Sequence, residues 1–385
     1  MAKLRRSKKT KAFIEDNLAL QVSSRGPSKP SLFPSLPLEL HTEICSYLME
    51  LPEDSRATES GLFDPVFLYR TRTLLALTQT CRSLRQSYFH IAWKSLSIVS
   101  DDRICNPSSI FIPKFRYNSI AREILNRMAF LVHHPHRALL VIDVSITLVD
   151  HAAKAVLPTF AKALNLLTNL KTLRVFVPLD AHFQHTSIIE ESFKTIVLPS
   201  LKILSLPVTF APFLSCCPNV QKVYCNSKNS CWSERLSRQF IETAATHCLT
   251  LDSLRFLWPL VDQNLLALVA TRLPRLHELG MFLIRSKTTF MDALSLISGM
   301  SHIRALYLES CASPNSSEFP CEDRMAIEAA ATALRSVPAN DGEVKSLIID
   351  WDLLSERIRF IFESSGNSPF LLDSPTSKHA LVDRS

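Results

Sequence analysis

Apolar residues near the start of the chain recur at helical spacing in two stretches. In residues 36–48 they stand at positions 36, 40, 44, 47 and 48, and Pro37 falls in the first turn, where a helix does not need the missing N–H. The second stretch has leucines at 74, 75, 77 and 84 and a cysteine at 81, and it closes on an aromatic cluster that ends at Trp93. The pattern predicts one helix, an interruption over residues 49–72, and then a short helix pair.

Beyond residue 93 the pattern changes to short apolar strands that alternate with amphipathic helices. Residues 94–99 alternate polar and apolar side chains, as a first strand does. Triplets with apolar residues in first, fourth and sixth place then begin at Leu139, Leu170, Leu201, Val220, Leu251, Leu276, Ile303 and Val344. Helical periodicity covers residues 119–132, 156–167, 236–247, 264–273, 290–297 and 324–337. The predicted fold class is α/β.

Four of these units share a longer signature, in which a polar turn precedes the apolar triplet. The turns read Thr168-Asn169-Leu170-Lys171, Pro199-Ser200-Leu201-Lys202, Pro218-Asn219-Val220-Gln221 and Pro274-Arg275-Leu276-His277. This resembles a leucine-rich repeat. The repeat is irregular, because the unit spacing varies and the Asn or Cys that regular repeats place at a fixed distance after the third apolar residue is matched only by Cys311. A doubly wound parallel sheet uses the same alternation, so periodicity alone leaves both architectures open.

The net charge of +7 is concentrated at the N-terminus. Residues 3–11 carry six Lys and Arg and no acidic residue, and subtracting six from +7 leaves about +1 for residues 12–385. A nucleic-acid-binding domain usually shows a basic excess of its own, so no nucleic-acid partner is expected for the body of the chain.

Glycine usage excludes several classes of enzyme. The six glycines are at positions 26, 61, 280, 299, 342 and 366, and the closest two are 19 residues apart. Phosphate-cradling loops and dinucleotide turns need glycines a few residues apart, because the backbone must approach the phosphate without a Cβ in the way. The G-x-S-x-G and H-E-x-x-H motifs are also absent from the sequence. We therefore expect no cofactor and none of the common nucleotide, dinucleotide, α/β-hydrolase or zincin chemistries in their motif-bearing forms.

Cysteine and histidine spacing gives little support for a metal site. The ten cysteines form no C-x-x-C pair, and the set Cys216, Cys217, Cys225 and Cys231 matches no known zinc-ligand spacing. The histidines of residues 133–136 surround a proline at an expected helix end, without a Cys or carboxylate at ligand spacing. Reduced thiols in the cytoplasm or nucleus are the simplest interpretation.

The chain is expected to divide into four segments. Residues 1–30 are a basic arm, 31–93 a helical module, 94–365 the strand–helix region and 366–385 a tail rich in Ser, Pro and Thr. The basic arm is either a nuclear import signal or a solvated tail. No apolar run reaches the roughly 18–20 residues that span a bilayer, and no membrane partner is expected.

The helical module resembles the F-box, whose usual form is Leu-Pro-x-Glu followed by an apolar residue, a short connection, a Leu-x-x-Cys-Arg stretch and a Trp. The matching residues are Leu36-Pro37-Leu38-Glu39-Leu40, Ile44, Tyr47-Leu48, Leu74-Leu75-Ala76-Leu77, Thr80-Cys81-Arg82-Ser83-Leu84 and Trp93. The interruption over residues 49–72 is longer than the usual connection, but closing the longer loop costs only about 1 kcal/mol. Together with the repeat-like region, the chain resembles a fungal-type F-box protein.

The resemblance implies a non-catalytic substrate-recognition subunit of an SCF-type ubiquitin ligase. The Skp-family adaptor of that ligase would contact Leu36, Pro37, Leu38, Leu40, Ile44, Leu48, Leu75, Leu77, Cys81 and Leu84. A protein target, which the sequence does not identify, would bind the strand side chains that point away from the buried triplets, chiefly Arg174, Phe176, Tyr224, Arg255, Phe282 and Tyr307. Two alternatives remain open, which are a repeat scaffold unconnected to ubiquitin and an enzyme with an unrecognised site.

Overall fold

We describe the fold from a computed structural model of the chain. The structure describes residues 36–37, 39–41, 43–44, 65–98, 116–178, 186–226, 234–256, 263–282, 294–310, 321–337, 344–351, 356–363 and 370–372. The expected arm over 1–30, the F-box positions Leu38 and Leu48, and nearly all of the expected tail lie outside these residues.

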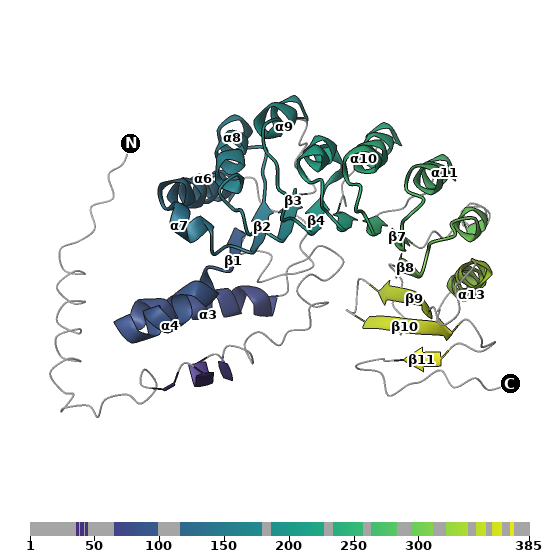
Figure 1. Ribbon diagram of the computed structural model, residues 1–385, viewed down its shortest axis with the longest axis horizontal. Helices are drawn as coiled ribbons and strands as arrows, with labels where there is room; N and C mark the ends of the chain where they lie inside the picture. Colours follow the sequence, from purple (N-terminus) through teal and green to yellow (C-terminus); the bar gives the residue numbers. More distant parts are fainter. Residues whose placement is uncertain are drawn as a thin grey trace.

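The described strands form one sheet in which spatial order follows chain order (Figure 1). The strands are β1 (Ser95–Ile98), β2 (Asp143–Thr147), β3 (Thr172–Phe176), β4 (Ile203–Leu206), β5 (Lys222–Cys225), β6 (Ser253–Phe256), β7 (Glu278–Phe282), β8 (Ala305–Ser310), β9 (Val344–Trp351), β10 (Glu356–Glu363) and β11 (Phe370–Leu372). Strands β1 to β9 are parallel, whereas β10 and β11 join antiparallel.

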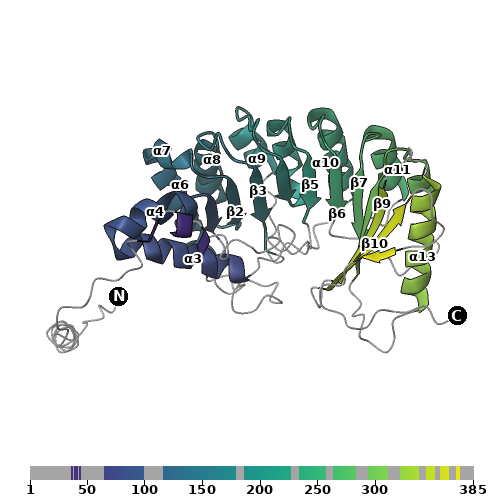
Figure 2. The same cartoon turned by 60° about the horizontal axis from the view of Figure 1, so that its bottom comes forward.

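The helices that connect the parallel strands lie along one side of the sheet, on the outside of its curve (Figures 1 and 2). They are α6 (Tyr117–His133), α7 (Pro135–Ala138), α8 (Ala153–Leu164), α9 (Thr186–Phe193), the 3₁₀ segment η4 (Val208–Cys216), α10 (Glu234–His247), α11 (Gln263–Arg272) and α13 (Cys321–Ser336), with a short helix over 294–298. Doubly wound sheets reverse their strand order and carry helices on both faces. The sequential order observed is instead compatible with an α/β solenoid.

The apolar triplets build the core between sheet and helices. Their fourth residues form one row in register across neighbouring strands, and each is fully buried: Leu173, Leu204, Val223, Leu254, Leu279, Leu306 and Leu347. Because side chains alternate along a strand, the residues between them point to the helix-free face. The triplet predicted at Leu139 is wrong. Leu139 follows the end of α7 and is 49 % exposed, and the buried triplet is Val141, Val144 and Ile146.

One hydrogen-bond pattern recurs where the chain enters each strand. The carbonyl of Lys171 accepts from the N–H groups of both Lys202 (2.8 Å) and Ile203 (3.0 Å). The carbonyls of Lys94, Ile142, Lys202, Gln221, Asp252 and His277 each accept two consecutive N–H groups of the next unit in the same way. The register is therefore uniform although the sequence spacing is irregular, and variation in unit length is confined to the connections.

Polar side chains of the entry turns form a second ladder beside the first. Asn169 Nδ2 donates to the Leu139 carbonyl at 2.7 Å, and Asn219 Nδ2 donates to that of Pro199 at 3.0 Å. Ser200 Oγ bonds the Thr168 carbonyl at 2.6 Å in the same position. In three of the four signature turns the polar residue thus holds its turn to the preceding one.

The N-terminal helices have a small core of their own. Helices α3 (Pro65–Thr80) and α4 (Arg82–Ala92) pack through Leu74, Leu84, Tyr88, Ile91 and Ala92. Cys81 separates them and caps α4, since its Sγ accepts from the N–H of Leu84 at 3.5 Å. The predicted helix pair is confirmed, but α3 begins at Pro65, so residues 65–72 belong to this helix and not to the expected interruption over 49–72.

Two contacts attach further segments to this pair. His41 is buried, and its Nδ1 lies 2.8 Å from the hydroxyl of Tyr88, which fixes the first helical segment against α4. Trp93 stacks on Phe130 of α6 with ring centroids 5.4 Å apart, and the Arg137 guanidinium lies over both rings. The helix pair is therefore joined to the first units of the sheet by an aromatic–cation cluster.

A buried lysine closes the last described helix–strand unit. Lys345 in β9 points to the helix side, is 5 % exposed, and donates from Nζ to the carbonyls of Leu334 (3.0 Å), Arg335 (3.2 Å) and Val337. Carbonyls at a helix C-terminus lack intrahelical donors and carry the negative end of the helix dipole. A buried ammonium therefore supplies the missing donors and offsets the negative charge.

We expect Lys345→Met to lower the free energy of unfolding by about 1–3 kcal/mol, because the buried carbonyls at the end of α13 lose their donor. Denaturant unfolding followed by circular dichroism measures the change. Lys171→Met, at an exposed lysine, is the control and should unfold like the wild type. Equal midpoints for the wild type and Lys345→Met would contradict this role for Lys345.

Candidate interaction site

A row of side chains crosses the helix-free face of the sheet, with one residue from each strand. In register from β2 to β9 these residues are Ser145, Arg174, Ser205, Tyr224, Arg255, Gly280, Tyr307 and Ile348. We call this set the open-face row. Four of the six predicted target-binding residues are in it, and Phe176 stands on the same face two residues beyond Arg174.

Arg255 is the centre of this row. Its guanidinium lies between two aromatic rings, 5.1 Å from the ring centroid of Tyr224 and 3.2 Å from that of Tyr307. Its Nη2 is 3.5 Å from Oε2 of Glu278, and the same oxygen is 3.7 Å from Lys222 Nζ. Cations over aromatic faces are attracted by the ring quadrupole, more strongly when water is excluded. The arginine therefore orients both tyrosines.

Gly280 makes this arrangement sterically feasible. It stands between Arg255 and Tyr307 in the row, and a Cβ built on it would lie 2.7 Å from both Cβ and Cγ of Arg255. Atoms this close overlap, so any side chain here would displace the stem of the arginine. The absence of a side chain lets Arg255 cross the β7 position and reach the ring of Tyr307.

The structure revises two of the predicted target-binding residues. Arg255 and Phe176 are only 6 % and 5 % exposed, so they support the surface and do not offer contact area. Arg174, Tyr224 and Tyr307 are half-buried and do present part of their side chains. The side chain of Phe282 lies outside the described residues.

Asn226 is a residue of this face that the sequence pattern did not single out. Directly after β5, its Nδ2 donates to the Val175 carbonyl at 2.7 Å and to Ser205 Oγ at 3.0 Å. It therefore links three neighbouring strands at their exit. A lone Asn after an apolar triplet was the available sequence signal, but only the register reveals its partners, which lie 51 and 21 residues earlier.

The helix pair and the segment before it place the predicted adaptor-binding residues in three environments. Pro37 and Leu40 are exposed, the latter by 42 %. Five more are half-buried: Leu36, Ile44, Leu75, Leu77 and Cys81. Leu84 is 5 % exposed and belongs to the core of the pair, so it is not available to a partner, and we remove it from the contact set.

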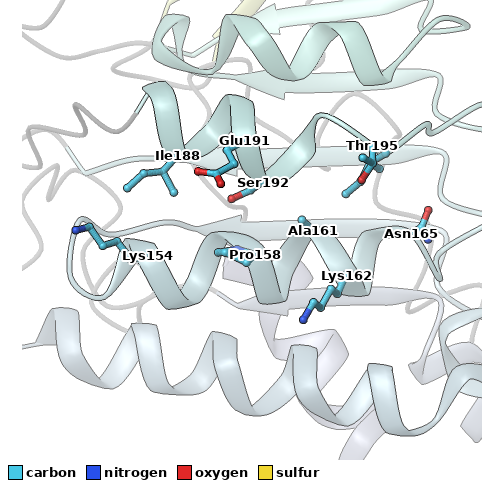
Figure 3. Close-up of a pocket in the computed structure, with 10 residues that line it drawn as sticks. Lys154, Pro158, Ala161, Lys162, Asn165, Ile188, Glu191, Ser192 and Thr195 are labelled. Atoms are coloured by element: carbon cyan, nitrogen blue, oxygen red, sulfur yellow. The ribbon is translucent and has the colours of Figure 1, made fainter.

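A groove of about 620 Å³ lies between α8 and α9, on the helix side of the sheet (Figure 3). Its lining is Lys154, Pro158, Ala161, Lys162, Asn165, Ile188, Glu191, Ser192, Thr195 and Ile196. Glu191 is its one carboxylate, and the lining includes no histidine or cysteine. This groove contains none of the predicted site residues.

The buried cysteines are not arranged as a metal site. Burial raises the pKa of the Cys216 thiol to about 11 and that of Cys248 to about 12, and burial followed by the proximity of Cys216 and Cys248 raises the pKa of Cys217 well above its usual value. Nucleophilic attack needs the thiolate, which these raised pKa values disfavour. Within the described residues no three His, Cys, Asp or Glu side chains are grouped to hold a metal ion, and Cys231 lies outside them.

A scan against models of known protein families found no match, and a search of curated proteins found no similar sequence. Among the described residues, none of the helices combines the length and apolar character needed to cross a membrane.

We expect Gly280→Ala to destabilise the protein by about 1–3 kcal/mol, because the new methyl group overlaps the stem of Arg255. Thermal unfolding and the near-ultraviolet signal of the tyrosines report the change. Gly299→Ala is the matched control, since its Cβ would meet only the Leu296 carbonyl, at 3.4 Å. Similar unfolding temperatures for the two variants would count against the steric role of Gly280.

We expect the thiols of Cys216, Cys217 and Cys248 to resist alkylation by iodoacetamide at pH 8.5 in the folded protein. Their raised pKa values keep them protonated at that pH, and burial blocks the reagent. The half-buried Cys81 should react faster. Peptide mass spectrometry with and without denaturant measures each thiol, and rapid native labelling of Cys217 would contradict its buried, protonated state.

Proposed function

We propose that the chain is a substrate-recognition subunit of an SCF-type ubiquitin ligase. In this proposal the segment 36–93 docks the Skp-family adaptor, and the open-face row holds a protein target. The chain itself performs no bond chemistry, and it contributes by keeping the target close to the ubiquitin-charged enzyme.

The observation that carries the proposal is the exposure of apolar side chains on the N-terminal helices. The helix pair already has a core of its own in Leu74, Leu84, Tyr88, Ile91 and Ala92. Leu40 nevertheless stays 42 % exposed and Pro37 is exposed, at positions where the F-box resemblance expects adaptor contacts. Covering a leucine side chain contributes roughly 1.5–3 kcal/mol. Completing the burial of a few such side chains is enough to support a stable complex.

The open-face row supports the target half of the proposal. It combines two tyrosines, a half-buried arginine at Arg174 and small residues between them, and tyrosine and arginine are the residues that most often dominate protein interfaces. The stack around Arg255 holds both tyrosine rings before any partner arrives. Pre-ordered side chains lose less conformational entropy on binding.

The second candidate is a repeat scaffold that binds proteins without any connection to ubiquitin. The same open-face row favours it equally, because target binding needs no adaptor. The two candidates differ only in the role of the N-terminal helices.

We expect the wild-type chain to capture the Skp-family adaptor in a pull-down, and Leu40→Asp to weaken capture at least ten-fold. A carboxylate at this position must lose its hydration without gaining a partner. Gln86→Asp is the matched control, because it adds the same charge at an exposed position of α4 outside the predicted contact set. It should bind like the wild type.

Absence of adaptor binding by the wild type, or equal binding by Leu40→Asp, would leave the scaffold as the remaining candidate.

A Leu40→Asp bait also identifies the target. Uncoupled from the ligase, it should retain target proteins that the wild type sends to degradation, and mass spectrometry of both captures compares them.

A further inference from the structure

A second surface of the sheet differs in chemistry from the open-face row. It consists of the segments that lead from a helix end into strands β2 to β8, which are residues 134–142, 165–171, 194–202, 217–221, 248–252, 273–277 and 299–304. The structure describes all of them. Because the parallel strands are in register, these segments line one edge of the sheet, which we call the strand-entry edge.

The strand-entry edge is strongly cationic. Lys171, Lys194 and Arg275 are its exposed cations, Arg137, Lys202 and Arg304 are half-buried, and its one carboxylate is Asp252. That carboxylate is 2.5 Å from His277 Nδ1. Residues 12–385 as a whole carry a net charge of only about +1, six of the chain's +7 lying in residues 3–11, so the positive charge here is a local concentration.

The same edge carries exposed aliphatic side chains. Among the described residues, five large hydrophobic side chains are exposed, and three of them are Leu139 (49 %), Val197 (60 %) and Leu249 (78 %). A fourth, Val132, lies in the last turn of α6 and adjoins the edge. Scattered exposed leucines are normal, but a concentration along one edge beside lysines marks an interaction site.

Helix dipoles do not account for all of this composition. Cations often neutralise the carbonyls at a helix C-terminus. Lys171, however, directly precedes β3, seven residues after α8 ends, and its side chain is exposed. Exposed leucine and valine side chains carry no charge, so they do not stabilise a helix dipole either.

The spacing of the apolar residues fits an extended polypeptide. Leu139, Val197 and Leu249 stand about four to six residues before β2, β4 and β6, so their separation measured across the strands is two strand spacings, or about 9–10 Å, between neighbours. Three residues of an extended chain span about the same distance. Lys171 precedes β3, between the strands that follow Leu139 and Val197, and Lys202 precedes β4. Carboxylates between the apolar residues of a bound segment would therefore face these two lysines.

We propose that the strand-entry edge binds an extended acidic segment of another protein, with aliphatic residues about three positions apart and carboxylates between them. Aliphatic side chains do not stack on bases, whereas single-stranded nucleic acids are held largely by aromatic or arginine stacking. The proposal does not depend on the ubiquitin-ligase function, and it concerns a different surface from the open-face row.

The test uses the full chain and a fluorescent peptide with leucine at every third position and glutamate elsewhere. We expect saturable binding in fluorescence anisotropy that weakens as salt is added. Lys171→Glu with Lys194→Glu should weaken binding about ten-fold, because two attractions become repulsions at exposed positions. Val197→Ser with Leu249→Ser should weaken it several-fold without lowering the salt dependence.

The matched control is Arg122→Glu with Lys154→Glu, which changes the same number of exposed charges away from this edge. Lys154 lies at the opposite end of α8 from Asn165, which belongs to the strand-entry edge (Figure 3). The control should bind the peptide as the wild type does.

Three outcomes would overturn the proposal. They are no peptide binding by the wild type, equal weakening by the control pair, and tighter binding to vesicles of phosphatidylserine or to a single-stranded oligonucleotide than to the peptide. A peptide in which glutamine replaces glutamate should bind at least ten-fold more weakly, and equal binding would remove the role of the lysines.

Discussion

The sheet depends on a single recurring hydrogen-bond arrangement, in which one carbonyl accepts two consecutive N–H groups from the next unit. It recurs from the entry of β2 to that of β8 and sets where each strand starts relative to its neighbour. A slip of one residue would turn every side chain to the other face of the sheet. The buried row of leucines and valines and the open-face row are both consequences of this register.

Once the register is set, the helix-free face follows from the residues that alternate with the core. The core row is uniformly aliphatic, whereas the open-face row combines two serines, a glycine, two tyrosines, two arginines and one isoleucine. Gly280 and Arg255 illustrate how closely this face is packed, because the missing side chain of one is the space that the other occupies. The tyrosine rings are thereby held in place by a buried arginine, and a surface ordered in advance favours binding.

The N-terminal helices and the sheet have separate cores but share a junction. Trp93, Phe130 and Arg137 join α4 to α6 and α7, so the exposed apolar residues of the first helical segment and the rows of the sheet belong to one connected structure. Under the proposed function this junction holds the adaptor-binding and target-binding parts in a defined relation. The strand-entry edge adds a third surface, with a chemistry suited to acidic chains.

The sequence by itself determined the strand–helix alternation, the buried face of nearly every strand and the helix pair before the sheet, because these depend on periodicity within a few residues. Only the tertiary structure decided the one-sided placement of the helices, since two architectures share the same local pattern. It also decided that Arg255, Phe176 and Leu84 are buried, that Leu139 is exposed, and that Lys345 donates to carbonyls at the end of α13. The partners of these side chains come from other strands and helices, and no local pattern of apolar and polar residues specifies them.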